Sequence, residues 1–137
     1  MIINGKEIAE KIITQSKAEA TKIKKLGIFP KLAVILVGED TASKTYVNNK
    51  RKACEKAEII SEEYSLPATT SQEEIIELIE KLNADKTVSG ILVQLPLPLH
   101  LNSKVICEKI SPFKDVDAFT SVNVGKLVQG TATLLPC

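Results

Sequence analysis

Tyr46 and Lys50 stand four residues apart, in the segment of residues 43–50. If this segment is helical, the spacing places the aromatic ring and the amine on one face of the helix. A ring can stack on a flat ligand and an amine can transfer a proton, so the pair is a candidate for ligand chemistry. On the residues alone we favour a simpler interpretation, in which Lys50 is a solvated lysine and Tyr46 a half-buried ring.

Two other features point away from common chemistries. The turn after the apolar run of residues 32–37 reads GEDTAS, which is neither GxGxxG nor a P-loop, and its two acidic residues would repel a pyrophosphate. His100 is the only histidine. A Ser-His-Asp or Cys-His site would need it, but it lies in a Leu/Pro-rich loop, where we expect a solvated side chain.

The elements that would position these residues follow from the hydrophobic pattern. Helices are predicted over residues 5–25, from residue 40 or 41 to about 57, after the capping box of residues 71–74, and over 104–110. Strands are predicted over residues 32–37, 59–66 and 88–94, and polar residues in the second of them indicate an edge position.

This alternation predicts a βαβαβ unit in an α/β domain, a three-layer α/β/α sandwich with a mostly parallel sheet. It is not a typical dinucleotide-binding Rossmann domain, because the phosphate-binding turn is missing. Ligands of such sheets bind beyond the carboxyl ends of the strands, so we expect a site near the segments that follow Val37, Leu66 and Val93.

The composition and charge of the chain limit the kinds of partner that it can bind. The chain has 137 residues, 44% hydrophobic and 26% charged, with a net charge of +1, so we expect one globular domain without a field for nucleic acid or anionic lipid. With no apolar leader or membrane-length stretch, we expect a soluble, cytoplasmic protein and a small-molecule partner. Cys54, Cys107 and Cys137 lack zinc-site spacing, so we expect reduced thiols and no metal.

Two further segments change the interpretation of Tyr46 and Lys50. Residues 90–98, GILVQLPLP, and residues 114–119, KDVDAF, resemble the methylenetetrahydrofolate dehydrogenase/methenyltetrahydrofolate cyclohydrolase family in sequence and separation. Shorter matches at residues 36–38, 51–54, 123–125 and 136–137 extend the resemblance over essentially the whole chain.

The resemblance implies a role for each of four residues. Tyr46 is similar to the family's stacking platform for folate, and Asp117 to the carboxylate that accepts hydrogen bonds from the pterin. Lys50 is similar to the catalytic lysine and Gln94 to its hydrogen-bonding partner. For Asp117, a turn-capping aspartate is the alternative.

In the family, the chain continues into a Rossmann domain that binds NAD(P). We therefore expect residues 1–137 to be the folate-binding catalytic domain, truncated before that half, and NADP or NAD to be bound mainly by the missing domain. On this basis the isolated chain should not complete the dehydrogenase step. Family members are homodimeric, and the oligomeric state of this chain is left open.

Four positions depart from the usual family pattern. Thr41 replaces a common Pro, Thr120 a common His, and Ala118 and Glu58 replace Gly. We expect Ala118 to add a methyl group beside the folate contact and Glu58 to affect only its turn.

Two interpretations other than an enzyme are also considered. A receiver-like signalling module would use Glu39 and Asp40, but it needs an aspartate at the end of the third strand, where Gln94 stands. A non-catalytic folate-binding or assembly fragment of the same family is the other alternative.

Overall fold

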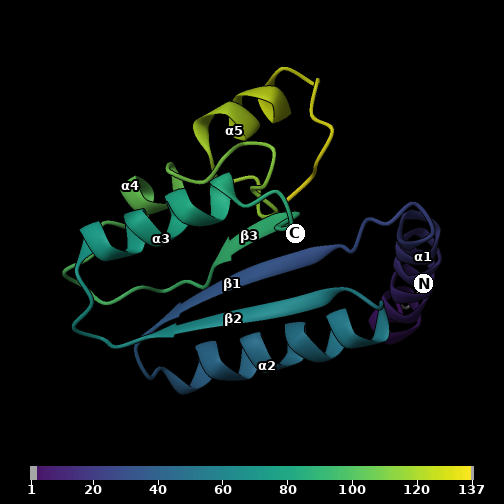
Figure 1. The fold of residues 1–137 in the computed structure, drawn as a ribbon, viewed down its shortest axis with the longest axis horizontal. Coiled ribbons are helices and arrows are strands. Elements are labelled where there is room, and N and C mark those ends of the chain that lie inside the picture. Colours follow the sequence, from purple (N-terminus) through teal and green to yellow (C-terminus); the bar gives the residue numbers. More distant parts are fainter. Residues whose placement is uncertain (1–2, 137) are drawn as a thin grey trace.

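The computed structural model describes residues 3–136 and shows helices alternating with strands (Figure 1). The elements in chain order are α1 (Gly5–Lys24), β1 (Lys31–Val37), α2 (Thr41–Lys56), β2 (Ile60–Leu66), α3 (Gln72–Ala84), β3 (Gly90–Val93), α4 (Ser103–Cys107) and α5 (Ser121–Val128). All of the predicted helices and strands are present, with small shifts at their ends, and α5 is an addition.

The three strands form a parallel sheet in the order β2-β1-β3. The central strand β1 is covered on both faces, which explains its uninterrupted apolar sequence. Strand β2 is at one edge and alternates between exposed and partly buried positions. The predicted α/β class and the edge position of the second strand are both confirmed.

Alternating side chains divide the core between the two faces of the sheet. On one face α2 packs through Val47 against Val34, Leu36 and Leu92. The other face is larger, and α3 and α4 cover it with a cluster that includes Ile35, Ile75, Ile79, Ile91 and Ile106. Figure 1 shows the resulting layers, with α2 on one side of the sheet and α3, α4 and α5 on the other.

Local capping sets where α2 and α3 begin. The Ser71 hydroxyl accepts from the Glu74 amide at 3.2 Å, and the Glu74 carboxylate accepts from the Ser71 amide at 2.7 Å. This is the predicted capping box. Asp40 caps α2 by accepting from the Ser43 amide at 2.7 Å, which ties the start of the helix to the end of β1.

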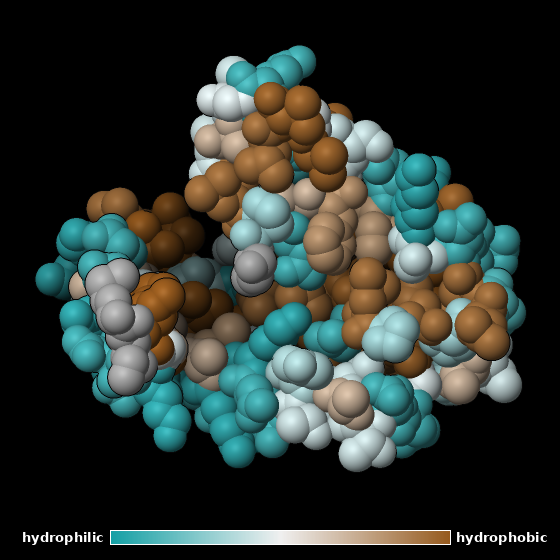
Figure 2. All heavy atoms as spheres, turned by 180° about the vertical axis from the view of Figure 1, so that it is seen from behind, coloured by the Kyte–Doolittle hydropathy of each residue, from teal (hydrophilic) through white to brown (hydrophobic). Residues whose placement is uncertain are grey.

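Helix α1 lies apart from the sandwich, at the end of the sheet where the strands begin (Figure 1). Ala20 is its one buried residue among those described. The surface between α1 and the sandwich is hollowed and hydrophobic, as Figure 2 shows from behind. This hollow of about 370 Å³ is lined mainly by Ile12, Ala20, Ile23, Pro30 and Ile59.

Glu58 connects α1 to the sandwich. Its carboxylate pairs with Lys17 at 3.1 Å and Lys24 at 3.3 Å, and these two ammonium groups lower its pKa. Its φ of 58° places it in the left-handed region that favours glycine. The expectation that Glu58 affects only the turn was therefore incomplete, because its side chain also holds α1.

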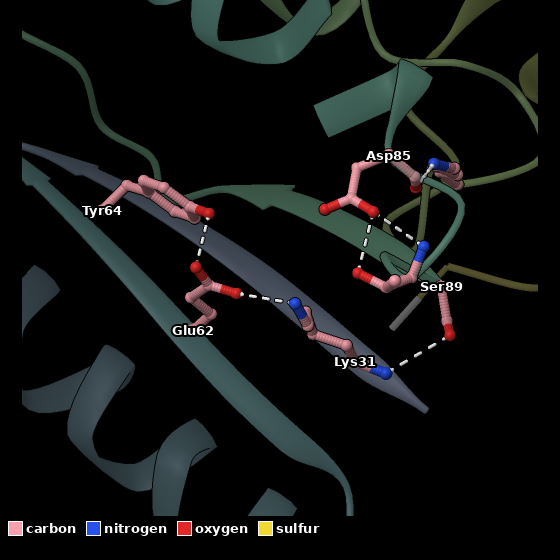
Figure 3. A network of polar contacts seen from close by, with 7 residues as sticks. Lys31, Glu62, Tyr64, Asp85 and Ser89 are labelled. Carbon is pink, nitrogen blue, oxygen red and sulfur yellow. Dashed lines mark hydrogen bonds and ion pairs between the residues drawn. The ribbon is translucent and has the colours of Figure 1, made fainter. Parts of the chain in front are cut away.

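A polar network joins the strands at the end where they begin (Figure 3). Lys31 pairs with Glu62 at 3.1 Å, and its amide donates to the Ser89 hydroxyl at 3.3 Å. The Tyr64 hydroxyl donates to Glu62 at 2.7 Å, and this bond, together with burial and the nearby carboxylates, raises the pKa of Tyr64 to about 12. The network links β2, β1 and the loop before β3.

Within residues 3–136, none of the helices combines the length and the apolarity needed to cross a bilayer. Cys54 and Cys107 are free thiols, and burial raises the pKa of both. Cys137 lies outside the described residues. Over the described part of the chain, no group of His, Cys, Asp and Glu side chains is arranged to hold a metal ion.

Candidate functional site

A cleft of about 570 Å³ lies between α2, the end of β3 and the segment that carries the KDVDAF sequence. Its walls contain all four residues singled out in the sequence, Tyr46, Lys50, Gln94 and Asp117. The remaining lining is mostly apolar and comes from Leu32, Ala53, Cys54, Leu92, Leu95 and Val116. The structure thus brings together residues that lie far apart along the chain.

The cleft exists because the sheet is wider than the helix that covers it. Helix α2 packs against β1 and β2, so the corresponding face of β3 is left partly open. Strand alternation places Gln94 on the same face as Leu92, which belongs to the α2 side of the core. On α2, Tyr46 and Lys50 occupy successive turns of the wall, as their spacing predicted.

Lys50 and Gln94 are in direct contact. The Lys50 Nζ donates to the Gln94 Oε1 at 3.2 Å. The Gln94 Nε2 donates in turn to the Leu95 carbonyl oxygen at 2.7 Å, so the amide is held with its oxygen toward the lysine. Gln94 is only 9% exposed. The amine is therefore held in the cleft by a neutral partner.

Asp117 supplies the negative charge of the cleft. Its side chain is half-buried, and burial raises the pKa of its carboxyl group. The Lys50 ammonium opposes this shift, while the neighbouring Asp115 carboxylate adds to it. One cation and one anion therefore face a mostly apolar lining, an arrangement suited to a flat ligand with a polar edge.

Tyr46 lies on the wall of the cleft with 62% of its surface exposed. The simpler interpretation of a half-buried ring was therefore wrong. An exposed ring has a face free to stack on a ligand. Because the ring and Lys50 belong to one helix face, a ligand stacked on Tyr46 would present its adjoining part to the amine.

The segment that carries Asp117 is anchored on both sides. The Lys114 ammonium donates to the carbonyl oxygens of Leu82, Asn83 and Asp85 at 2.7–2.9 Å, at the carboxyl end of α3. The Ile91 amide donates to the Lys114 carbonyl at 2.7 Å, so the segment runs beside β3.

Gly90 makes this close approach possible. A Cβ atom at position 90 would lie 2.5 Å from the Val116 Cγ1 atom, which is too close without a shift. Sequence reasoning missed Lys114, Gly90 and the apolar lining. The available signals were the positions of Gly90 and Lys114 at the start of the two segments that match the family.

The cleft lies at one of the three segments where a site was expected. Gln94 and Leu95 follow Val93, whereas the turn at Gly38 does not contribute. The cleft runs beside β3, because α2 covers only part of that strand: Val47 packs on Leu92, and Gln94 at the end of the strand lies on the cleft wall. His100 lies outside the lining, and its ring contacts the Thr70 carbonyl oxygen at 3.0 Å.

These features define a class: a parallel α/β domain without a phosphate-binding turn, whose cleft pairs a lysine and an amide with an aromatic ring and a carboxylate. The family model described as "Tetrahydrofolate dehydrogenase/cyclohydrolase, catalytic domain" matches residues 3–117. The chain belongs to this family, as its resemblance in sequence indicated.

Individual relatives agree with the family assignment. The chain is 55% identical over 136 residues to the bifunctional protein FolD of Acetivibrio thermocellus, covering 99% of this chain and 48% of that protein. It is 50% identical over 137 residues to the protein of the same name from Bacillus cytotoxicus, again covering 48% of the relative. The chain thus spans about half the length of the curated relatives it matches.

Solved structures show the same fold. The bifunctional enzyme FolD from Campylobacter jejuni superposes with a TM-score of 0.95 at 47% identity, over 97% of this chain and 48% of that one. The Trypanosoma brucei enzyme, solved with NADP and an inhibitor, gives a TM-score of 0.94 at 33% identity, over 100% of this chain and 48% of that one.

Proposed function

We propose that this chain supplies the folate site and the catalytic lysine of a bifunctional methylenetetrahydrofolate dehydrogenase and methenyltetrahydrofolate cyclohydrolase. The observation that carries the proposal is the meeting of Tyr46, Lys50, Gln94 and Asp117 around one cleft. Membership of the family supports the choice of a tetrahydrofolate as the substrate.

Tyr46 and Asp117 bind and orient the folate. The exposed Tyr46 ring stacks on the aromatic part of the ligand, and such stacking contributes about 0.5–1.5 kcal/mol beyond the burial of area. The Asp117 carboxylate accepts hydrogen bonds from the amino and ring N–H groups of the pterin, which fixes the direction of the ring as well as its affinity. Together they bring the one-carbon bridge of the folate beside Lys50.

Lys50 performs the proton transfers of the cyclohydrolase step. Water adds to the methenyl carbon that bridges two nitrogens, and the tetrahedral adduct opens to 10-formyltetrahydrofolate. The amine exchanges protons with the adding water and the departing nitrogen. Gln94 holds the amine at 3.2 Å without adding a charge that would compete for the substrate.

The dehydrogenase step needs NADP or NAD, and the described residues offer no phosphate-binding turn for a dinucleotide. The turn after β1 is acidic, and the sequence has no glycine-rich phosphate loop. We infer that the cofactor would be bound mainly by the other half of the enzyme, and when bound it would supply the hydride acceptor. The role of this chain in that step is to hold the methylene carbon in position.

Calorimetric titration with 5-formyltetrahydrofolate, a stable folate, tests the proposal. The 137-residue chain should bind it saturably, and Asp117→Ala should weaken binding by about tenfold or more, because charge-assisted hydrogen bonds are lost. Lys86→Ala, an exposed residue outside the cleft, is the matched control and should bind as tightly as the unaltered chain. Absence of saturable binding by the unaltered chain would contradict the proposal.

A second candidate is a folate-binding or assembly fragment of the same family without activity. The rate of methenyltetrahydrofolate hydrolysis distinguishes this candidate from the catalytic one. We define the completed enzyme as a chimera of this chain with the remaining half of the Acetivibrio thermocellus relative, which is 55% identical over the shared part. A chimera that binds folate but hydrolyses no methenyltetrahydrofolate would support the second candidate.

A further inference from the structure

Asp115 lies two residues before the proposed pterin ligand and does not line the cleft. It is a carboxylate with only 3% of its surface exposed. Its Oδ1 accepts from the Phe119 amide at 3.2 Å, and its Oδ2 accepts from the Thr120 amide at 2.9 Å. The Thr120 hydroxyl at 2.8 Å and the Asn123 Nδ2 at 3.0 Å also donate to Oδ2.

A carboxylate is needed at this position because every one of these partners is a donor. If asparagine stood here, its NH2 group would face another hydrogen-bond donor. An apolar side chain would leave all of the donors without an acceptor. Burial opposes ionisation of Asp115, but the hydrogen bonds from Thr120, Asn123 and Phe119 outweigh it and lower the pKa. Asp115 is therefore an anion with a fixed place in the fold.

The hydrogen bonds of Asp115 close the backbone around Asp117. Asp115 forms a parallel bridge with Ile91 of β3 on one side, and it holds Phe119 and Thr120 on the other. Between these points Ala118 has a φ of 55°, in the left-handed region. The direction of the Asp117 side chain into the cleft is set by this closed turn.

We propose that Asp115 is a positioning residue for folate recognition: through its hydrogen bonds to Phe119, Thr120 and Asn123 it holds the turn that directs the Asp117 carboxylate into the cleft. This inference rests on the proposed function, since it assumes that Asp117 binds the pterin. It assigns a second task to the KDVDAF segment, in which one aspartate contacts the ligand and the other places it.

The charges around Asp117 give this proposal a distinctive signature. Lys50 faces it from α2 and lowers its pKa, and Asp115 raises it from within the same segment. Cys107, at the end of α4, is also close, since both aspartates contribute to its raised pKa. Removing the Asp115 charge should therefore lower the pKa of Asp117, because ionisation would no longer place two negative charges side by side.

The first test compares Thr120→Val with Thr120→Ser in the 137-residue chain, titrated with 5-formyltetrahydrofolate. Valine matches the shape of threonine but lacks the hydroxyl that donates to Asp115 at 2.8 Å, whereas serine retains it. We expect the Kd to rise about tenfold for Thr120→Val and less than about threefold for Thr120→Ser, with both variants folded by circular dichroism. Equal affinity of Thr120→Val and the unaltered chain would overturn the inference.

The second test measures the Kd of Asp115→Asn from about pH 3 to about pH 8, a range that begins below the ordinary aspartate pKa of about 3.9. We expect Asp115→Asn to bind the ligand more weakly than the unaltered chain does. We also expect the midpoint of its loss of affinity at acid pH to lie at a lower pH than in the unaltered chain. A uniform loss with an unchanged midpoint would mean general structural support and would overturn the inference. If Asp115→Asn does not fold, the Thr120 pair decides. Lack of binding by the unaltered chain would instead refute the proposed folate site itself.

Discussion

The Lys50 Nζ lies 3.2 Å from the Gln94 Oε1, although the two residues are 44 positions apart in the sequence. Helix α2 supplies the amine, the end of β3 supplies the amide, and the Leu95 carbonyl fixes the orientation of that amide. This contact makes the lysine part of a cleft and not a freely solvated surface residue.

Replacing Gln94 by Leu tests the contact. Leucine keeps much of the side-chain volume but cannot accept from Lys50, so the amine should lose its fixed position. We expect methenyl hydrolysis by the completed enzyme to fall by about tenfold or more, a loss typical of misplaced acid–base groups. The Kd for 5-formyltetrahydrofolate should change less. A hydrolysis rate equal to that of the unaltered enzyme would remove Gln94 from the mechanism.

Folate binding should depend on the ionisation of Asp117, whose pKa is raised mainly by burial. As the pH falls through this raised pKa, the carboxylate becomes protonated and loses acceptor capacity, so affinity should decline at a higher pH than an ordinary aspartate would dictate. Titration with 5-formyltetrahydrofolate over pH measures the midpoint. An acid limb at or below the ordinary aspartate value would contradict the expectation.

The raised pKa of Asp117 also affects folding stability, which should fall as the pH rises through this range, whereas folate affinity should increase. A carboxyl group with a raised pKa in the folded state costs stability as the pH rises from its unfolded value through its folded value. Asp117→Asn should therefore reduce the loss of stability in that window while it weakens folate binding. Thermal unfolding at several pH values would show this, and a variant with an unchanged pH dependence would count against it.

Ala118 tests the backbone geometry beside Asp117. It is 3% exposed and has a φ of 55°, a conformation in which a β-branched side chain is strained. We expect Ala118→Val to destabilise the chain by about 2 kcal/mol or more, from strain and overpacking together. Ala118→Gly should change stability by less than about 1 kcal/mol. Chemical denaturation of both variants checks this, and equal stability of the two would be inconsistent with the geometry.

Lys114 anchors the Asp117 segment to the end of α3 through three carbonyl oxygens. Lys114→Met keeps the aliphatic stem but removes the donors, so we expect a loss of about 1.5–3 kcal/mol in unfolding free energy. Lys86→Met, at an exposed position of the neighbouring loop, is the control and should have little effect. Indistinguishable denaturation midpoints for the two variants would refute this anchoring role.

Much of the fold could be predicted from local patterns. The apolar run in β1 and the capping box at Ser71 are strong signals because burial and hydrogen bonding act at short range there. Helix α5 was missed because Gly125 and the valines of Ser121–Val128 have low helix propensity, and its place depends on tertiary contacts such as that of Asn123 with Asp115.

The site could be predicted only in part. The spacing of Tyr46 and Lys50 indicated a shared helix face, but no local pattern places Gln94 and Asp117 opposite that face. Their meeting depends on α2 packing mainly on β1 and β2, which leaves part of β3 beside the cleft, and on Gly90 admitting Val116 beside the strand. These are long-range packing relationships, and the family resemblance was needed to identify the residues.

The most direct test of the central claim is the turnover of Lys50→Met in the completed enzyme, with both activities measured on the same preparation. Methionine keeps the stem of the side chain and removes the amine, so folate binding should largely survive. General acid–base catalysis contributes about 10²–10⁴-fold, so we predict that methenyl hydrolysis falls by at least about 100-fold while the dehydrogenase rate falls less. An undiminished hydrolysis rate would contradict the account and make Lys50 an ordinary lysine of α2.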